Sequence, residues 1–206
     1  AQPGKQLSFV RFLYVAMHRG GFRDRMLAEL MPPLTAEGKS LFWESCGRRF
    51  TGLEYQEADK LSRRNKEFIQ QLFPPGDLYA TVFPPRVQRL LGAVGPATEG
   101  ARRMLERVGF RYVKRIDPFD GGPHYECHTD EVTLVRGCRR LMVAEGEPGR
   151  GAPPMLVGAM SRSGRVRFRA VRAEAAVEGG SVRLPAEARR LLRVGAGDRV
   201  HAVPFA

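Results

Sequence analysis

The residues best placed to do chemistry surround a pair of glycines in the second half of the chain. Asp117 and Asp120 precede Gly121 and Gly122, and Glu126 follows them. Several carboxylates close together can receive a cationic group through charge-assisted hydrogen bonds, and glycines let the backbone come close to a ligand. Asp and Gly are also ordinary turn residues, and from the residues alone a tight hairpin turn is the favoured explanation of this segment.

Two histidines, His124 and His128, flank the same segment, with Cys127 between them. On a β-strand, Glu126 and His128 share one face while Cys127 points to the other, which does not suit a metal cluster. We therefore expect a polar strand near a ligand pocket and no metal ion. The chain has three cysteines without CxxC spacing, which indicates reduced thiols and no structural zinc site.

The chain is basic, with a net charge of +12 that comes mainly from arginine. This charge suits an anionic partner, such as nucleic acid or a phosphorylated cofactor, or else a surface of solvated guanidinium groups. The basic residues are spread along the whole sequence, so charge alone does not select nucleic acid. No apolar run approaches the roughly 18 to 20 residues of a membrane span, and residues 1–4 do not resemble a signal peptide. We expect a cytoplasmic protein without a membrane partner.

Hydrophobic periodicity and helix-breaking residues divide the chain into helices and strands. Helices are predicted over 7–18, 35–50, 55–73 and 98–108, and strands over 26–31 and 78–83. A turn-rich segment begins at Glu145. After it the pattern predicts short strands, a helix that starts at a proline, and a last strand, which together form a small β-rich domain.

Several stretches resemble the bacterial arginine N-succinyltransferase family. They are FRDRMLAELMPPL at 22–34, LFWESCGRRF at 41–50, ARRMLERVGFRY at 101–112 and, most specifically, IDPFDGGPHYEC at 116–127. The resemblance extends from Gly4 to about Val203. It implies an α+β fold with lobes like those of the GNAT acyltransferases, followed by a small C-terminal β-barrel-like domain.

The expected domains are residues 1–50 as the C-terminal half of a first GNAT-like lobe, 51–144 as a second lobe, and 145–206 as the β-rich domain. Two segments, 46–50 and 107–111, each leave a helix through a glycine and enter an aromatic-led strand. This repetition indicates either a duplicated lobe or a chance similarity.

The resemblance implies that succinyl-CoA donates its succinyl group to the α-amino group of arginine or ornithine in arginine catabolism. In such a transfer the amine attacks the thioester directly, and no covalent enzyme intermediate forms. The sequence is consistent with this mechanism because it has no recognisable nucleophile elbow.

The family pattern also assigns roles to residues. It implies that Asp117, Asp120, Gly121, Gly122 and Glu126 bind the acceptor, and that Gly4, Lys5 and Arg11 contact the cofactor. Relatives are longer at the N-terminus, where part of the cofactor site lies. We therefore expect this chain to be a fragment or to be completed by another polypeptide, within a homo- or hetero-oligomer.

One departure from the family pattern concerns the proton donor, a histidine in a Val-His-Pro segment. Here the segment reads Val94-Gly95-Pro96, so Gly95 occupies the donor position and cannot move a proton. His124 and His128 are the hypothetical replacements, because they flank the acidic signature.

Two alternatives follow from the same observations. The Gly95 replacement and the short N-terminus are also typical of a catalytically silent paralogue or partner subunit. The charge and the segment VRLPAEARRLLRVGAGDRV at 182–200 favour a nucleic-acid-binding module similar to AbrB-like regulators, although the same pattern builds small barrels with other roles.

Overall fold

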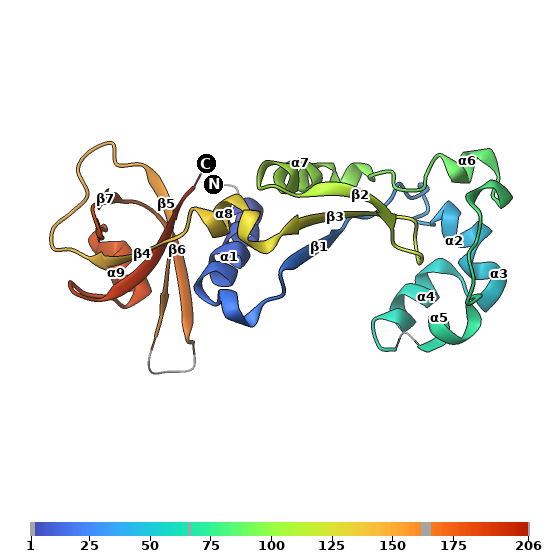
Figure 1. Cartoon of the computed structure of the whole chain (residues 1–206), viewed down its shortest axis with the longest axis horizontal. Coiled ribbons are helices and arrows are strands. Elements are labelled where there is room, and N and C mark those ends of the chain that lie inside the picture. Colours follow the sequence, from blue (N-terminus) through green and yellow to red (C-terminus); the bar gives the residue numbers. More distant parts are fainter. Residues whose placement is uncertain (1–2, 66, 162–165, 206) are drawn as a thin grey trace. The chain divides into compact units, whose positions relative to one another are not determined.

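The computed structural model describes residues 3–65, 67–161 and 166–205 (Figure 1). The fold is α+β, as predicted, and the chain forms two compact units. One unit combines Ala1–Arg25 with His128–Ala206, and the other is Met26–Cys127. Among the described residues, no helix has the length and apolar character needed to cross a membrane.

The unit formed by the two ends of the chain contains helix α1 and most of the β-structure (Figure 1). Its elements are α1 (Pro3–Met17), η1 (Arg19–Gly21), η4 (Thr129–Glu131), α8 (Thr133–Arg136), β4 (Arg139–Val143), β5 (Pro154–Met160), β6 (Phe168–Glu174), β7 (Ala176–Glu178), β8 (Ser181–Arg183), α9 (Ala186–Leu192) and β9 (Arg199–Pro204).

Six of these strands form one sheet in the order β6-β5-β9-β4-β8-β7. Alternate residues of a strand point to opposite faces, so each face can be covered by a different helix. On one face, Val157 and Val200 join a buried cluster with Leu192 of α9. On the other face, Gly158 leaves room for α1, because a Cβ at this position would lie 2.9 Å from Leu13 Cδ2.

The unit formed by the middle of the chain contains a small sheet and several short helices. Its elements are β1 (Arg25–Glu29), α2 (Leu41–Ser45), α3 (Gly47–Thr51), α4 (Tyr55–Ser62), α5 (Glu67–Leu72), η2 (Ala80–Val82), α6 (Pro85–Gln88), η3 (Pro96–Thr98), α7 (Glu99–Arg107), β2 (Arg111–Ile116) and β3 (Pro123–His128). The sheet has the order β1-β3-β2, and β2 and β3 are antiparallel.

The helices of this unit pack around an aromatic cluster. Trp43 of α2 is fully buried, and its indole N–H donates to the carbonyl oxygen of Leu53 at 3.0 Å. Its ring contacts those of Phe119, Tyr55 and Phe73, with centroids 4.5, 6.5 and 6.0 Å away. Phe119 belongs to the turn between β2 and β3, so this cluster ties the turn to the helices.

Several predicted elements are confirmed. The helices over 7–18 and 98–108 are α1 and α7, the strand over 26–31 is β1, and the C-terminal strand, helix and strand are β8, α9 and β9. Each of these segments carries its own signal, either an apolar run closed by glycine or a proline that starts a helix.

Other predictions were wrong or incomplete. The helix over 35–50 is two short helices, α2 and α3, which meet at Cys46, and the helix over 55–73 is also interrupted between α4 and α5. The strand over 78–83 is the 3-10 turn η2, and most of its side chains are exposed. An exposed segment between proline pairs gains little from strand formation when it has no neighbouring strand, which accounts for the error.

The predicted barrel-like domain is a six-stranded sheet whose order runs from β6 to β7, and no closed barrel is found among the described residues. The compact units also divide the chain differently from the predicted boundaries at residues 50 and 144. Those boundaries describe GNAT-like lobes and stay a prediction.

The turn between β2 and β3 generates a first test of the fold. A Cβ added at Gly122 would lie 2.2 Å from the carbonyl oxygen of Leu30, which follows β1. Because backbone must move to relieve this clash, we expect Gly122→Ala to lower the free energy of unfolding by about 1–3 kcal/mol in urea denaturation. Gly100→Ala is the control, since a Cβ there meets nothing within 4 Å. Equal urea midpoints for both variants and the wild type would contradict this packing.

Candidate functional site

The segment between β2 and β3 is a closed turn that fixes both aspartates. The N–H of Asp117 donates to the carbonyl oxygen of Gly122, and the N–H of Gly121 donates to that of Asp117, each at 2.8 Å. One carboxylate oxygen of Asp117 and one of Asp120 also accept the N–H of Phe119 and Gly122, both at 2.8 Å. The turn interpretation is therefore confirmed. The hydrogen bonds of the turn use only one oxygen of each carboxylate, so the second oxygen of each can accept a hydrogen bond from a ligand.

The glycines allow the turn to pack against its surroundings. Gly121 has a φ of +83°, and a Cβ there would lie 3.2 Å from the ring of Phe42. Its carbonyl oxygen accepts the N–H of Gly92 at 2.9 Å. The hydroxyl of Ser40, itself 1% exposed, donates to the carbonyl oxygen of Asp120 at 3.2 Å. The turn is thus held by backbone contacts that bulkier residues would prevent.

Asp120 lies in a partly desolvated environment, with the negative charges of Asp117 and Glu29 nearby. The pKa of Asp120 is raised from 3.8 to about 6, mainly by burial and also by the charges of Asp117 and Glu29, against a hydrogen bond from Gly122 that lowers it. A carboxyl group with such a shift is less stable when ionised than it would be in water. A cation bound beside it would remove the penalty.

Tyr55, at the start of α4, faces the same acidic group. Burial raises the pKa of this phenol to about 12, and the charges of Asp120, Asp59 and Asp117 contribute to the increase. The hydroxyl therefore stays protonated at neutral pH and remains available as a hydrogen-bond donor. The ring centroid of Tyr55 lies 5.6 Å from that of Phe119, the residue that separates the two aspartates in the sequence.

His124 lies beside Glu29 on the neighbouring strand β1. Its Nε2 is 3.8 Å from Glu29 Oε1, and the side chain is only 16% exposed. This nitrogen is buried and makes no hydrogen bond among the described residues. A buried ring nitrogen that lacks a hydrogen bond usually has a missing partner, which a ligand atom can supply. Of the two predicted replacement histidines, His124 therefore has the more suitable surroundings.

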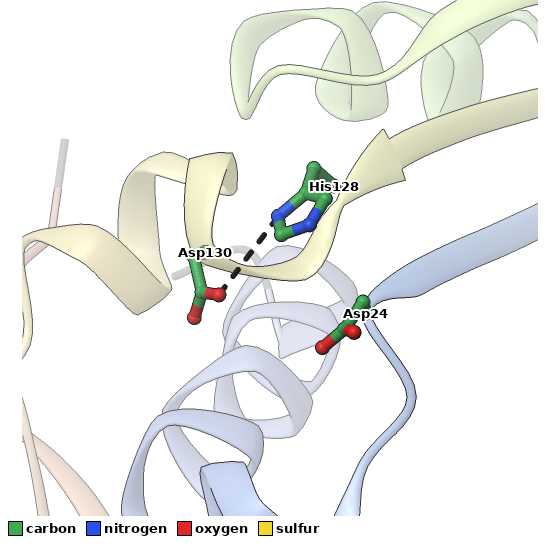
Figure 2. A group of neighbouring side chains, drawn as sticks. All are labelled: Asp24, His128 and Asp130. Atoms are coloured by element: carbon green, nitrogen blue, oxygen red, sulfur yellow. Dashed lines mark ion pairs between the residues drawn. The ribbon is translucent and has the colours of Figure 1, made fainter.

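His128 belongs to a different cluster, which Figure 2 shows together with Asp24 and Asp130. The ligand atoms of these three exposed residues lie within 4.8 Å of one another. Arg19 donates to Asp130 at 2.5 and 2.9 Å and to Asp24 at 2.6 Å. Its guanidinium thus bridges the two carboxylates and offsets part of their charge, so we assign no metal to this cluster.

The structure does not bring Glu126 into the acidic pair. Glu126 forms an ion pair with Arg115 of β2, and its side chain is 12% exposed. Its charge is therefore already compensated within the sheet. A direct role in binding the acceptor remains a prediction for Glu126, and it is better supported for Asp117 and Asp120.

Gly95 is enclosed by backbone. Its N–H donates to the carbonyl oxygen of Met31 at 2.8 Å, and a Cβ at this position would lie 2.5 Å from the carbonyl oxygen of Pro32. The hydroxyl of Thr98 also donates to Met31, at 3.0 Å. The packing here is built around the glycine, so a histidine cannot be inserted without moving the segment.

The predicted cofactor residues lie on α1. Gly4 and Lys5 belong to its first turn, and the side chain of Arg11 is exposed. The ammonium of Lys5 lies over the rings of Phe9 and Phe205, 5.4 and 5.3 Å from their centroids. The backbone of a helix start can still bind phosphate, whereas the Lys5 side chain already has an aromatic partner.

Three residues of this site were not predicted from the sequence: Glu29, Tyr55 and Ser40. Glu29 and Ser40 precede the acidic turn by about eighty residues or more, and Tyr55 by about sixty. Residue type alone did not mark these three residues as part of a binding site. Only the capping position of Ser40, whose hydroxyl accepts the N–H of Trp43 at 3.1 Å, could have been inferred from the helix that follows.

The chain matches two protein-family models along nearly its whole length. The model for the arginine N-succinyltransferase beta subunit matches residues 1–134, and the model for the C-terminal domain of that subunit matches residues 139–204. The nucleic-acid-binding and silent-paralogue alternatives find no support in these matches.

Individual relatives agree with these models. The chain is 38% identical over 201 residues to an arginine N-succinyltransferase of Escherichia coli and 40% identical over 203 residues to arginine N-succinyltransferase subunit beta of Pseudomonas aeruginosa. It also resembles the solved arginine/ornithine succinyltransferase subunit AI of Pseudomonas aeruginosa, with a TM-score of 0.77 and 31% identity.

These alignments cover most of this chain but only part of each relative. They include 97%, 98% and 96% of the chain, and 58%, 59% and 56% of the respective relatives. The chain thus spans a little more than half the length of the relatives it matches.

The shifted pKa of Asp120 predicts a pH effect on stability. Because the folded-state pKa lies above 3.8, the proton is bound more tightly in the folded protein. The stabilisation of the folded state by this tighter proton binding is complete below about pH 4, and it is lost as the pH rises through about 6. We expect Asp120→Asn, which can keep the hydrogen bond from Gly122, to be more stable than the wild type at pH 7.5 by up to about 2 kcal/mol, and to lose this advantage at pH 4.

Urea unfolding between pH 4 and pH 7.5 measures this difference, with Asp77→Asn as the control because Asp77 is exposed. A pH-independent difference between Asp120→Asn and the wild type would show that Asp120 titrates normally.

Proposed function

The chain belongs to the arginine N-succinyltransferase family, and we propose that it supplies the acceptor-binding part of an enzyme that transfers a succinyl group from succinyl-CoA to the α-amino group of arginine or ornithine. The observation that carries this proposal is the partly buried acidic pair Asp117 and Asp120. The chain has a net charge of +12, yet it keeps these two carboxylates and Glu29 close enough to raise the pKa of Asp120.

The positive charge of a cationic amino acid would complement the negative charge of this acidic group. A guanidinium can donate two parallel hydrogen bonds to one carboxylate, and an ammonium can donate up to three. The second oxygens of Asp117 and Asp120 are the acceptors that we assign to this role. Tyr55 adds a neutral hydroxyl donor, which suits the carboxylate that arginine and ornithine also carry.

The proposed reaction removes two protons from the acceptor nitrogen and returns one to sulfur. The α-ammonium of the acceptor loses a proton, and its nitrogen forms a bond to the thioester carbonyl carbon. The same nitrogen then loses a second proton, and the carbon–sulfur bond breaks as the thiolate of CoA leaves and takes up a proton, so one proton is released overall. We assign the proton transfer to His124, because its Nε2 makes no hydrogen bond among the described residues and lies 3.8 Å from Glu29 Oε1. Gly95 leaves the usual donor position without a titratable group.

For the acyl donor, we propose that the N–H groups at the start of α1, at Gly4 and Lys5, contribute to the phosphate site, with Arg11 nearby on the same helix. We further propose that the segments 1–50 and 51–144 correspond to GNAT-like lobes. Two of the relatives are named as subunits, which supports an oligomer for the whole protein, either homomeric or heteromeric.

The acidic pair can be tested by a thiol-release assay on the complete gene product with arginine and succinyl-CoA. Loss of one charged hydrogen bond costs about 1.5–3 kcal/mol, so we expect Asp117→Asn and Asp120→Asn each to raise the KM for arginine about tenfold or more. The KM for succinyl-CoA should change little. Asp77→Asn is the control, and an unchanged arginine KM in both site variants would contradict the assignment.

The histidines can be separated by single substitutions. We expect His124→Asn to lower kcat by about a hundredfold and to remove a limb of the pH–rate profile, because general acid–base catalysis contributes on this scale. His128→Asn, outside the acidic site, should leave kcat within about twofold. An undiminished rate in a variant that carries both changes would discard the proposal for either residue.

A further inference from the structure

A pocket whose charge is opposite to that of the acidic turn lies within the unit that contains α1 and the six-stranded sheet. It has a volume of about 610 Å³. Its charged and titratable lining residues are Arg140 of β4, Arg199 and His201 of β9, and Arg193 and Asp198 of the loop between α9 and β9. Met17, at the end of α1, lies on its wall.

The pairing of β4 with β9 places three of these side chains on one face of the sheet. Arg140 pairs with His201 and Met142 with Arg199 in the antiparallel register. Paired residues share a face, and so do residues two apart on one strand, so Arg140, Arg199 and His201 project to the same side. The neighbouring residue Val200 projects to the other side, into the buried core.

Backbone hydrogen bonds fix the loop that carries Arg193 and Asp198. The N–H of Gly197 donates to the carbonyl oxygen of Val143 at 2.9 Å, and the N–H of Val143 donates to that of Asp198 at 2.8 Å. The carboxylate of Asp198 accepts the N–H of Gly195 at 2.8 Å. The loop is therefore tied to β4, and the pocket is largely preorganised.

Arg193 ends helix α9 in the left-handed conformation, with φ 59° and ψ 50°. Glycine is the usual residue at such a position, because a side chain is strained there. Arg193 therefore carries a long cationic side chain to the edge of the pocket from a position where glycine would carry none.

The positive charge of the pocket is not compensated. Over the described ranges, Arg140, Arg193 and Arg199 have no carboxylate partner, whereas Arg183 and Arg189 of the same unit pair with Glu178 and Glu147. Three guanidiniums and the single carboxylate of Asp198 leave a formal charge of about +2. Burial, followed by the charges of Arg140 and His18, lowers the pKa of His201, so this imidazole is neutral at pH 7 and can donate or accept a hydrogen bond.

We propose that this pocket binds a small molecule that carries one or more phosphate groups. Guanidinium groups arrive from two strands and from a separate loop, so they can approach a ligand from several directions. A tetrahedral phosphate offers oxygens in several directions, whereas a carboxylate offers two oxygens in one plane. The volume is sufficient for a ligand larger than a single phosphate ion.

This site is independent of the proposed acyl transfer. Met17 is at the opposite end of α1 from Gly4 and Lys5, and a fifteen-residue helix is about 22 Å long. The binding proposal can therefore hold even if the assignment of the acyl-donor residues fails.

Isothermal titration of the full chain with inorganic pyrophosphate tests the proposal. We expect saturable binding that the double variant Arg140→Gln, Arg199→Gln weakens at least tenfold. The matched control is Arg136→Gln, Arg150→Gln, which removes the same charge from exposed positions of the same unit and should change the affinity less than twofold.

Arg193→Gly separates binding from folding. Glycine relieves the left-handed conformation, so the variant should have an unchanged or higher Tm and yet bind pyrophosphate several-fold more weakly. A lower Tm with unchanged affinity would contradict the role of this side chain.

Four other outcomes would overturn the proposal. They are the absence of pyrophosphate binding, an equal loss of affinity in the two double variants, tighter binding of succinate than of pyrophosphate, and binding of a single-stranded RNA oligonucleotide in place of pyrophosphate. The third would indicate a dicarboxylate site, and the fourth a nucleic-acid surface.

Discussion

The acidic turn between β2 and β3 depends on one packing constraint, the insertion of Phe119 into the aromatic cluster around Trp43. The ring centroids are 4.5 Å apart, and Trp43 is fully buried. Phe119 lies between Asp117 and Asp120 in the sequence, so burying its ring holds the turn against the helices. Asp120 is partly buried in this turn, and burial is the largest cause of its raised pKa.

This arrangement has an energetic cost that packing elsewhere must offset. Like charges placed close together in a poorly hydrated region oppose folding, and proteins commonly retain such groups at functional sites. The C-terminal sheet carries the opposite case, a pocket lined by Arg140, Arg193 and Arg199 and, among the described residues, by the carboxylate of Asp198 alone. In both places the ligand that we propose has the charge that the protein omits, a cationic amino acid in the first and a phosphate in the second.

Local patterns in the sequence were sufficient for part of this structure. The apolar run of α1, the amphipathic helix α7 and the proline-started helix α9 are each specified by residues within the element. The DGGP segment could be identified both as a turn and as an acidic site, and it is a turn whose aspartates are partly buried. The two interpretations proved compatible, since hydrogen bonds within the turn use only one oxygen of each carboxylate.

The rest depends on contacts between distant residues. Nothing near Glu126 in sequence indicates that Arg115 would pair with it, and the proximity of Glu29 to His124 arises only when β1 joins β3. The segment 78–83 has strand-like composition, but without a strand beside it the chain forms a 3-10 turn. Tertiary context overrides local preference in each case.

The ionisation of Asp120 is the most direct measure of whether the turn is a receptacle for a cation. A ¹³C NMR titration of the aspartate carboxyl carbons, with and without saturating arginine, would give its pKa in the two states. A value of about 6 in the free protein that falls when arginine binds is expected, because a cation stabilises the carboxylate. A value near 4 in the free protein, or one that arginine leaves unchanged, would contradict the central claim.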